Sequence, residues 1–294
     1  MGGSEEPAAV APVRGEAVLR VEEDPPLLVV SDLHLGLGLR AGQEPRPYVA
    51  TAEGLAERFL AIAHRERAGR LLLLGDVKHH IRGVPRPVRL EVEEFFGRLE
   101  EAAIEMEVVL GNHDAGLPRA FPPEVTVHGA KGLLRRGNGY FHGHTWPSRR
   151  LLLGAQCLVM GHLHPGYRFA LPRDLEGSGK ERIWVRTTFP PSPAGGRKVR
   201  HPVPRARTAL VLPAFNPLCA NESLNRSEPS RGRKFLVRRF LLRGESRAYL
   251  LDGTDLGEIP WGPPEESASG PGPGESASGS RSLSRARNPR TPSR

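Results

Sequence analysis

The sequence contains few cysteines and no long apolar run, and both shortages exclude classes of protein. Cys157 and Cys219 are the only cysteines among 294 residues, too few for the disulfide framework of a small secreted domain. No segment approaches the roughly 20 consecutive apolar residues of a membrane-spanning helix. The first residues also lack the basic start and the apolar stretch of a secretory signal. We therefore expect a cytoplasmic protein that has no contact with a membrane.

Both ends of the chain lack the regular spacing of apolar residues that a folded domain needs. Residues 1–15 are rich in Gly, Pro, Ala and Glu. Residues 262–294 consist mostly of Gly, Pro, Ser, Ala and Arg, and the sequence ESASG occurs twice there. Segments of this composition cannot bury enough apolar surface to offset the entropy lost on ordering. We expect disordered tails at 1–15 and 262–294 on either side of one folded domain, 16–261.

Five polar motifs each follow a short apolar run of the kind that forms a buried strand. The first run, Leu27–Val30, leads into SDLH, and the second, Leu71–Leu74, leads into GD; later runs lead into GNHD, GH and GHLH. Open α/β sheets place their ligand sites at the carboxyl ends of parallel strands. The glycines let the backbone approach a ligand closely. In an extended chain, Asp32 and His34 would point to the same side.

The residue types in these motifs predict a metal-dependent hydrolase. Four imidazoles, two carboxylates and one carboxamide form a donor set that suits Mn2+, iron, Zn2+ or similar ions better than Ca2+. Two such ions roughly 3.5 to 4 Å apart would lower the pKa of a shared water and bind the oxygens of an in-line phosphoryl displacement. His113 would either protonate the leaving oxygen or stabilise the charged transition state, and Asp114 would orient His113.

The ordered motifs between Asp32 and His164 resemble the five-motif signature of the calcineurin-like metallophosphoesterase superfamily. The wordings SDLHLG, GDVKH, GNHD and GHLHP resemble the small archaeal phosphoesterases related to SbcD-type DNA-repair nucleases. The resemblance implies hydrolysis of phosphodiesters by a metal-bound hydroxide at two divalent transition ions, with Mn2+ expected and Fe, Zn, Co or Ni as alternatives. One ion would be held by Asp32, His34, Asp76 and His164, and the other by Asp76, Asn112, His144 and His162.

The sequence leaves the roles of several neighbouring residues open. His142 lies two residues before His144 and could compete for the ion, but only His144 follows a glycine, so the pattern favours His144. Lys78 and His79 follow the Gly-Asp motif and match the wording of the archaeal subgroup. Each is a candidate for supporting the metal ligands or for contact with the substrate, although a position in a solvated loop fits the pattern equally well.

The spacing of apolar residues predicts an α/β fold. Helical spacing at 48–68, which Gly69 would end, and at 88–103 alternates with the apolar runs. The first half should therefore form parallel strands with right-handed crossovers. Short, largely antiparallel strands should follow, beginning with a hairpin around Gly137–Gly139. The other expected strands are 17–21, 168–171, 183–189, 209–212, 235–242 and 248–251. The resemblance implies a four-layer αββα sandwich of two mixed sheets.

Charge is distributed unevenly along the chain. Residues 1–127 contain 14 Lys and Arg against 21 Asp and Glu, whereas residues 128–247 contain 23 against 6. The basic half suggests a polyanionic substrate such as DNA or RNA, because arginine and lysine displace counterions from phosphates. Arginine outnumbers lysine 37 to 5, however, as a GC-rich genome would also dictate. The expected phosphate contacts are Arg197, Lys198, Arg200, Arg205 and Arg207, followed by Arg231, Arg233 and Lys234.

Two classes of function agree with these observations. The first is a phosphoric ester hydrolase, either a nuclease acting on DNA or RNA or a phosphodiesterase or phosphatase acting on a small molecule or nucleotide. The second is a non-catalytic phosphate-binding module, which the intact set of ligand residues disfavours. No helicase or ATPase segment occurs in the sequence, so a helicase or other DNA-repair partner would be a separate chain.

Overall fold

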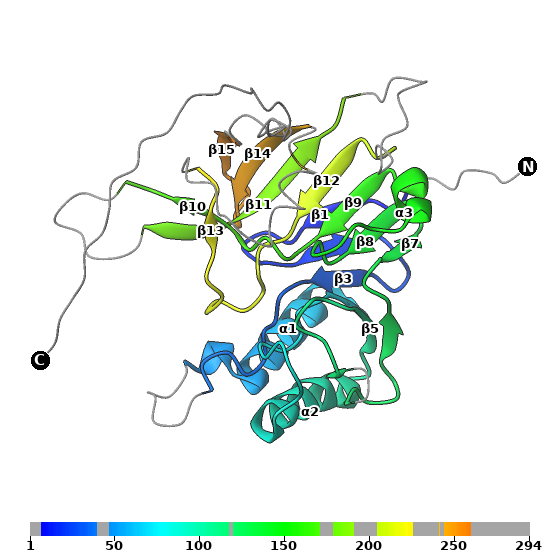
Figure 1. Cartoon of the computed structure of the whole chain (residues 1–294), viewed down its shortest axis with the longest axis vertical. Coiled ribbons are helices and arrows are strands. Elements are labelled where there is room, and N and C mark those ends of the chain that lie inside the picture. Colours follow the sequence, from blue (N-terminus) through cyan, green and yellow to red (C-terminus); the bar gives the residue numbers. More distant parts are fainter. Residues whose placement is uncertain are drawn as a thin grey trace, which may run out of the picture. The chain divides into compact units, whose positions relative to one another are not determined.

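Two β-sheets packed face to face form the centre of this computed structural model (Figure 1). The structure describes residues 7–39, 47–117, 120–170, 179–190, 205–225, 241 and 244–259. All of these residues lie in one compact unit, Met1–Gly262. The mixed α/β architecture with two mixed sheets agrees with the fold predicted from the sequence.

The first sheet contains six strands in the order of the sequence. They are β1 (Val10–Pro12), β2 (Leu19–Val21), β3 (Leu27–Val30), β4 (Arg70–Leu74), β5 (Glu105–Val109) and β6 (Thr126–His128). β1, β2 and β3 pair antiparallel, and β3 to β6 pair parallel. Val30 lies opposite Leu73, and Leu73 lies opposite Val108. The carboxyl ends of β3, β4 and β5 therefore lie level at one edge of the sheet.

The N-terminal segment differs from its prediction. Disorder was expected over 1–15, but Val10–Pro12 form β1, which pairs antiparallel with β2. The side chains of β1 are half-buried or exposed, so backbone pairing at the sheet edge stabilises this strand more than apolar burial does. The C-terminal tail predicted for 262–294 lies outside the described residues.

Two helices cover the outer face of the first sheet (Figure 1). The short 3-10 helix η1 (Tyr48–Ala50) leads into α1 (Ala52–Glu66), and α2 (Arg86–Glu101) follows β4. Both helices were predicted from the spacing of their apolar residues. Their buried side chains, such as Phe59, Phe95 and Phe96, join those of β3 and β4 in one core cluster.

Local backbone features determine where α1 begins and ends. The hydroxyl of Thr51 accepts a hydrogen bond from the Gly54 N–H (3.1 Å), which satisfies one of the unpaired donors at the start of the helix. The helix ends at Arg67, whose φ of 53° is left-handed. Gly69 was expected to occupy this position and does not.

The second sheet contains the remaining strands and mixes both pairing directions. Its strands are β7 (Leu133–Arg135), β8 (Asn138–Phe141), β9 (Cys157–Met160), β10 (Pro165–Arg168), β11 (Lys180–Thr188), β12 (Thr208–Val211), β13 (Glu222–Ser223), β14 (Glu245–Leu250) and β15 (Asp255–Glu258). β8, β9 and β12 pair parallel, as do β10 and β13, and the other pairs are antiparallel. The predicted hairpin joins β7 and β8, with positive φ at Arg136 and Gly137.

Several predicted strands of this half are shifted or lie outside the described residues. The strand expected at 168–171 is β10, which begins earlier, at Pro165. The strand expected at 235–242 falls on a segment of which the structure describes Leu241 alone. β6, β13, β15 and the helix α3 (Arg149–Gly154) had no counterpart in the prediction.

Alternating side chains divide the core into three layers. Leu28 and Val30 of β3 face α1 and α2, whereas Leu27 and Val29 face the second sheet, as the two-residue period of a strand requires. On the outer side of the second sheet, α3 buries Leu151 in a third cluster. The fourth layer of the predicted sandwich therefore contains this short helix.

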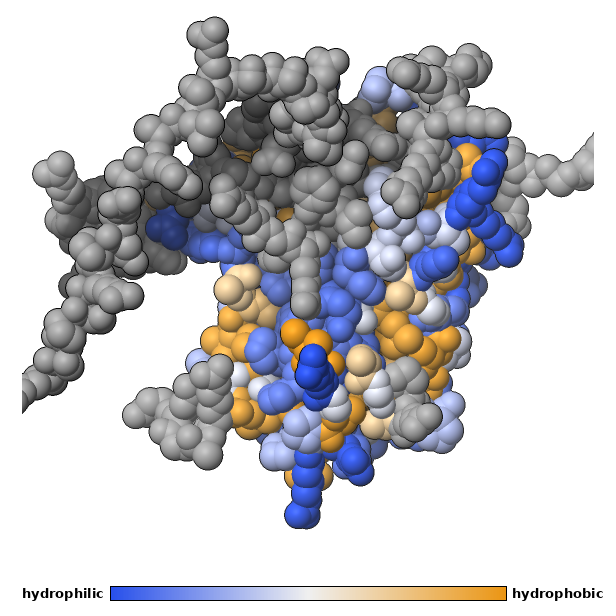
Figure 2. Space-filling view, viewed as in Figure 1, coloured by the Kyte–Doolittle hydropathy of each residue, from blue (hydrophilic) through white to orange (hydrophobic). Residues whose placement is uncertain are grey.

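No helix in the described part of the chain is long and apolar enough to cross a membrane. On the face shown in Figure 2, hydrophilic residues separate two hydrophobic regions in the lower part, where α1 and α2 lie. The hydrophobic residues there do not form one continuous surface.

Candidate metal centre

The predicted motifs meet at one edge of the sandwich, and both sheets contribute to it. Asp32 and Asp76 follow β3 and β4 of the first sheet, and His142 and His162 follow β8 and β9 of the second. The His162 N–H donates a hydrogen bond to Asp32 Oδ2 (3.0 Å). This bond joins the two sheets at the edge where parallel strands end, the place at which α/β folds form their sites.

The backbone at this edge is left-handed and not extended. Asp32, His34, Asp76, His162 and His164 have φ values between 45° and 68°. Aspartate and histidine are enriched among the few non-glycine residues that adopt this region, and each such residue costs of order 1–3 kcal/mol. The expectation that Asp32 and His34 converge because they lie in extended chain is therefore wrong. They converge because sharp left-handed turns follow the strands.

Two glycines of the motifs are required by close backbone approach, as predicted. A Cβ atom added to Gly111 would lie 2.3 Å from the Asp76 amide nitrogen. A Cβ atom added to Gly161 would lie 1.7 Å from the Ser31 hydroxyl and 2.8 Å from Asp32 Oδ2. A side chain at either position would displace one of the two carboxylates.

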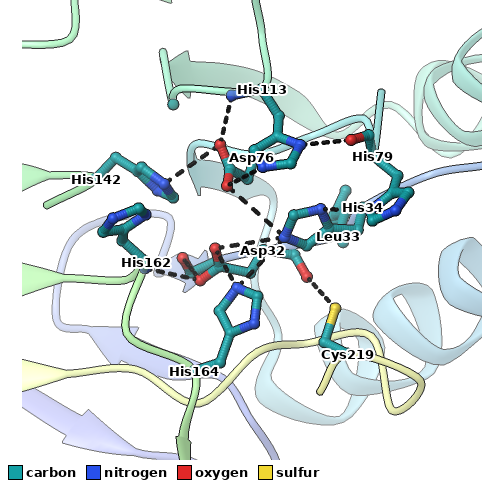
Figure 3. Close-up of polar contacts among 12 residues, drawn as sticks. Asp32, Leu33, His34, Asp76, His79, His113, His142, His162, His164 and Cys219 are labelled. Atoms are coloured by element: carbon teal, nitrogen blue, oxygen red, sulfur yellow. Dashed lines mark hydrogen bonds and ion pairs between the residues drawn. The ribbon is translucent and has the colours of Figure 1, made fainter. Parts of the chain in front are cut away.

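The first group of ligand-type atoms is the predicted one. His164 Nε2 lies 2.9 Å from Asp32 Oδ1 and 3.3 Å from His34 Nε2. His34 Nε2 also lies 3.7 Å from Asp76 Oδ2. Figure 3 shows these four side chains converging from the turns that follow β3, β4 and β9. Asp32, His34 and Asp76 are all at least 96% buried, so the group is closed to bulk water on most sides.

The second group differs from the prediction at one histidine. His142 Nε2 lies 3.3 Å from Asp76 Oδ1, and Asp76, His142 and His162 offer ligand atoms within 4.8 Å of one another. His144 was favoured by sequence, but its ring lies beside that of His142, 5.4 Å between centroids, and is not part of this group. Geometry therefore favours His142 over His144.

Carbonyl groups fix the orientation of two of these histidines. His142 Nδ1 is 2.6 Å from the carbonyl oxygen of Leu74, and His164 Nδ1 is 3.2 Å from that of Ala220. A carbonyl oxygen only accepts, so each Nδ1 carries the proton. Each Nε2 therefore faces the carboxylates, and it would give its lone pair to a metal ion bound between them, the usual arrangement of a metal-binding histidine.

Negative charge is concentrated on the two buried carboxylates. Burial alone would raise the pKa of Asp32 and Asp76, but His164 and His142, respectively, hold the pKa of these carboxyl groups below the usual value. Burial would lower the pKa of His142, yet the Asp76 carboxylate raises it to about 10. Burial lowers the pKa of His34 to about 3. Two anions held side by side out of water favour a bound cation.

Buried polar atoms of the cluster also fit a divalent ion. Asn112 Oδ1 has no hydrogen-bond partner among the described residues, and Asp32 Oδ1 and His142 Nε2 make no hydrogen bond of normal geometry there. Leaving such an atom unpaired costs about 1 to 3 kcal/mol. Imidazole nitrogens with carboxylate and amide oxygens are ligands that divalent transition ions accept. The residues present therefore fit divalent metal ions.

A comparison with known families agrees with this arrangement. The family model described as calcineurin-like phosphoesterase matches residues 25–187, more than half of the chain. The chain belongs to the calcineurin-like phosphoesterase family. Members are phosphoric ester hydrolases that use divalent metal ions, so the predicted superfamily is confirmed. The narrower likeness to archaeal SbcD-related phosphoesterases stays a prediction.

Two solved structures match this phosphoesterase at low sequence identity. A nuclease MPE from Pseudomonas putida is 16% identical, with a TM-score of 0.49, and the match covers 84% of this chain and 100% of that chain. The YfcE phosphoesterase from E. coli is 16% identical, with a TM-score of 0.34, and the match covers 79% and 97% of the two chains. No curated protein matches the sequence. At 16% identity, these matches do not indicate which substrate this chain hydrolyses.

His113 lies beside the phosphoesterase's carboxylates, as predicted, but Asp114 does not orient it. His113 Nε2 is 3.8 Å from Asp76 Oδ2. The buried Asp114 carboxylate instead accepts hydrogen bonds from the backbone N–H groups of Asp76, Val77 and Gly111, at 2.7 to 2.9 Å. His113 Nδ1 donates to the carbonyl oxygen of His79. Asp114 thus positions the backbone of two motifs, and a carbonyl group orients His113.

The two candidates of the Gly-Asp motif for substrate contact have different environments. Lys78 is fully buried, and its ammonium donates to the carbonyl oxygens of His80 and His113. This position corrects the prediction that Lys78 contacts substrate. His79 lines a cavity of about 510 Å³ with His113 and Ile81, so it stays a candidate. Among the basic candidates, Arg205 and Arg207 are described and exposed. The others, Arg197, Lys198, Arg200, Arg231, Arg233 and Lys234, lie outside the described residues.

The sequence analysis missed a segment that covers the site from the second sheet. Asn216, which follows β12, donates through Nδ2 to the carbonyl oxygen of Leu33 (2.8 Å). Cys219 Sγ lies 3.7 Å from the carbonyl oxygen of Asp32. These residues lie more than 180 positions after the first motif and form no motif of their own, so no local signal marked them.

Proposed function

We propose that this phosphoesterase holds two divalent ions and hydrolyses phosphodiester bonds in DNA or RNA. The observation that carries the proposal is the position of Asp76 between two sets of imidazoles. Its Oδ2 lies 3.7 Å from His34 Nε2, and its Oδ1 lies 3.3 Å from His142 Nε2. A carboxylate whose two oxygens face different ligand sets is suited to bridge a pair of ions.

The proposed ligand sets share this carboxylate. Asp32, His34, Asp76 and His164 would hold the first ion, and Asp76, Asn112, His142 and His162 would hold the second. His142 replaces His144 in the set that the family resemblance implied. Mn2+ is the proposed ion, with Fe, Zn, Co and Ni as alternatives, because the two sets contain nitrogen and oxygen donors.

Divalent ions held in this way supply the charge that activates water and stabilises a phosphoryl group during in-line displacement. The chain itself supplies the proton for the leaving oxygen. His113 donates through Nδ1 to the carbonyl oxygen of His79, so Nε2 is the atom that can take up a second proton. His113 also lines the cavity beside the carboxylates. Its imidazolium is placed to protonate the leaving oxygen there.

Two observations bear on the substrate. Residues 128–247 carry 23 Lys and Arg against 6 Asp and Glu, which supports a nucleic acid. The cavity of about 510 Å³ is lined partly by Leu37, Leu39 and Ile81, and this size suits a small organic group. A phosphodiesterase or phosphatase acting on a small molecule or nucleotide is therefore the second candidate. The nuclease hypothesis also includes a cytoplasmic location and a DNA-repair partner on a separate chain.

Metal content and hydrolysis of bis-p-nitrophenyl phosphate with Mn2+ test the reaction class. Asp76→Ala should lose both tightly bound ions and the activity, because it removes the shared carboxylate. His113→Ala should keep both ions and lose activity by about 10² or more, the usual span for a general acid. Ions per chain are measured by mass spectrometry after removal of excess metal.

A surface variant provides the matched control. Asp255→Asn removes an exposed carboxylate that pairs with Arg247 outside the site, and should keep both the ions and the activity. Two ions per chain in Asp76→Ala would contradict the proposed ligand sets. Loss of an ion from His113→Ala would make His113 a ligand and remove its proposed role as a proton donor.

A further inference from the structure

The segment that carries Cys219 is fixed against the first motif. Asn216 Nδ2 donates to the carbonyl oxygen of Leu33 (2.8 Å), and its Oδ1 accepts from the Leu218 N–H (2.9 Å). The Cys219 N–H donates to the carbonyl oxygen of Asn216 (3.2 Å). Cys219 therefore sits in a turn whose position is set by the same backbone that carries Asp32.

The guanidinium of Arg182 donates hydrogen bonds to the start of this segment, at Ala214 and Phe215. Arg182 Nη1 lies 2.9 Å from the carbonyl oxygen of Ala214 and 3.2 Å from that of Phe215. The Phe215 N–H in turn donates to the carbonyl oxygen of Ser31 (2.9 Å). These bonds place the thiol of Cys219 in a defined position, which a ligand atom requires.

The thiol lies among atoms of the first ion position. Cys219 Sγ, His34 and His164 offer ligand atoms within 4.8 Å of one another, and Figure 3 shows the sulfur beside Asp32 and below His34. The Nε2 atoms of His34 and His164 are 3.3 Å apart. Two nitrogens bound tetrahedrally to one ion at about 2.0–2.1 Å lie at about this separation. The group is therefore close to the geometry of a shared ion.

A buried oxygen points to the same place. Asp32 is fully buried, and its Oδ1 makes no hydrogen bond of normal geometry among the described residues. It lies 2.9 Å from His164 Nε2. The thiol would therefore add one sulfur donor to the nitrogen and oxygen donors that Asp32, His34, Asp76 and His164 offer at this position.

We propose that Cys219 is a soft ligand of the first ion position. When Zn2+ or Co2+ binds there, the S–H bond breaks, the proton leaves to water, and the sulfur electron pair binds the ion. Thiolates favour Zn2+ over harder ions such as Mn2+, so Cys219 raises the affinity of the first position for Zn2+ and Co2+, two of the alternative ions, relative to its affinity for Mn2+. The inference rests on the proposed function only in placing an ion at this position.

A cobalt spectrum tests the proposal, and Cys157 provides the control. Cys157 begins β9 and belongs to none of the ligand groups found among the described residues. Co2+ bound to wild-type protein and to Cys157→Ser should show the near-ultraviolet charge-transfer band of a cobalt thiolate. Cys219→Ser and Cys219→Ala should lack this band while binding the same number of Co2+ ions per chain.

Affinity gives a second readout that does not depend on the spectrum. Zn2+ should bind about tenfold or more weaker to Cys219→Ser than to Cys157→Ser, while Mn2+ affinity changes by less than about twofold. Bound Co2+ without the band in wild type, or a band that persists in Cys219→Ser, would overturn the role of Cys219 and leave the proposed function standing. Failure of wild type to bind either Co2+ or Mn2+ would overturn both.

Discussion

The sequence located the fourth motif but did not determine which of its two histidines, His142 or His144, faces the site. Both histidines follow β8, they are two positions apart, and their chemistry is identical. Phe141 of β8 lies opposite Met160 of β9, and the next residue, His142, contacts the carbonyl oxygen of Leu74 across the two sheets. Pairing between distant strands sets the register. The motif therefore predicted the site, and long-range pairing decided which histidine faces it.

Substitution of each histidine separates the two assignments. His142→Ala should weaken binding of the second ion by at least about 100-fold, because loss of a ligand exceeds the 10–100-fold effect of losing an outer partner. His144→Ala should keep both ions. Calorimetric titration of the metal-free proteins with Mn2+ measures both stoichiometries. The opposite pattern, with the ion lost from His144→Ala alone, would restore the assignment that the sequence favoured.

At the scale of elements, long segments were predictable and short ones were not. α1, α2, β3 and β4 bury apolar residues at regular spacing, which the sequence displays. β13 has two residues and α3 has six, too few for a periodic pattern to be recognised. Such elements are stabilised by pairing and packing with distant parts of the chain. The turns at the strand ends were located correctly, although their left-handed backbone was not foreseen.

Asp114 connects two of these turns, and its removal should destabilise the fold. Its carboxylate accepts from backbone N–H groups after β4 and β5. A hydrogen bond to a charged group contributes about 1.5–3 kcal/mol, so Asp114→Ala should lower the free energy of unfolding by about 3 kcal/mol or more. For a protein of this size, Tm should fall by about 6 °C or more. Thermal unfolding of the metal-free protein measures the change.

The exposed Asp255 again provides a matched comparison. Asp255→Asn removes a surface ion pair with Arg247, which is worth about 0–1 kcal/mol, so Tm should change by no more than about 2–4 °C. If Asp114 instead oriented His113, as the sequence predicted, the measurements would differ. Asp114→Asn would then lower activity while Tm and metal content stay at the wild-type values.

At the scale of the whole molecule, the centre depends on both sheets. Asp32 and Asp76 come from the first sheet, and His142, His162 and His164 follow strands of the second. The order of the motifs predicted this convergence. The acidic first part of the chain supplies both carboxylates, whereas the strongly basic part, residues 128–247, supplies three histidines. This division raises the question of whether the basic part binds the substrate.

Salt dependence distinguishes a nucleic-acid substrate from a small molecule. Binding of a fluorescent single strand to inactive Asp76→Ala should weaken steeply with salt, because each neutralised phosphate releases counterions. The slope on logarithmic axes is about 0.7 to 0.9 per phosphate, so four contacts would give a slope of about −3. Replacing Arg197, Lys198 and Arg200 by alanine in that background should flatten the slope to about −1. The same triple change in active protein should leave hydrolysis of bis-p-nitrophenyl phosphate nearly intact, because phosphate contacts position the strand.

A triple variant in the acidic half controls for the loss of charge itself. Arg65, Arg67 and Arg89 are exposed residues at or within α1 and α2, and changing them to alanine removes the same net charge. This variant should keep the steep slope, because these arginines lie in the acidic part of the chain. If the two triple variants flatten the slope equally, the effect comes from overall charge. If Asp76→Ala without further changes binds the strand weakly and with a shallow slope, the cavity lined by His113 indicates the substrate better, and a small-molecule phosphodiesterase is the better assignment.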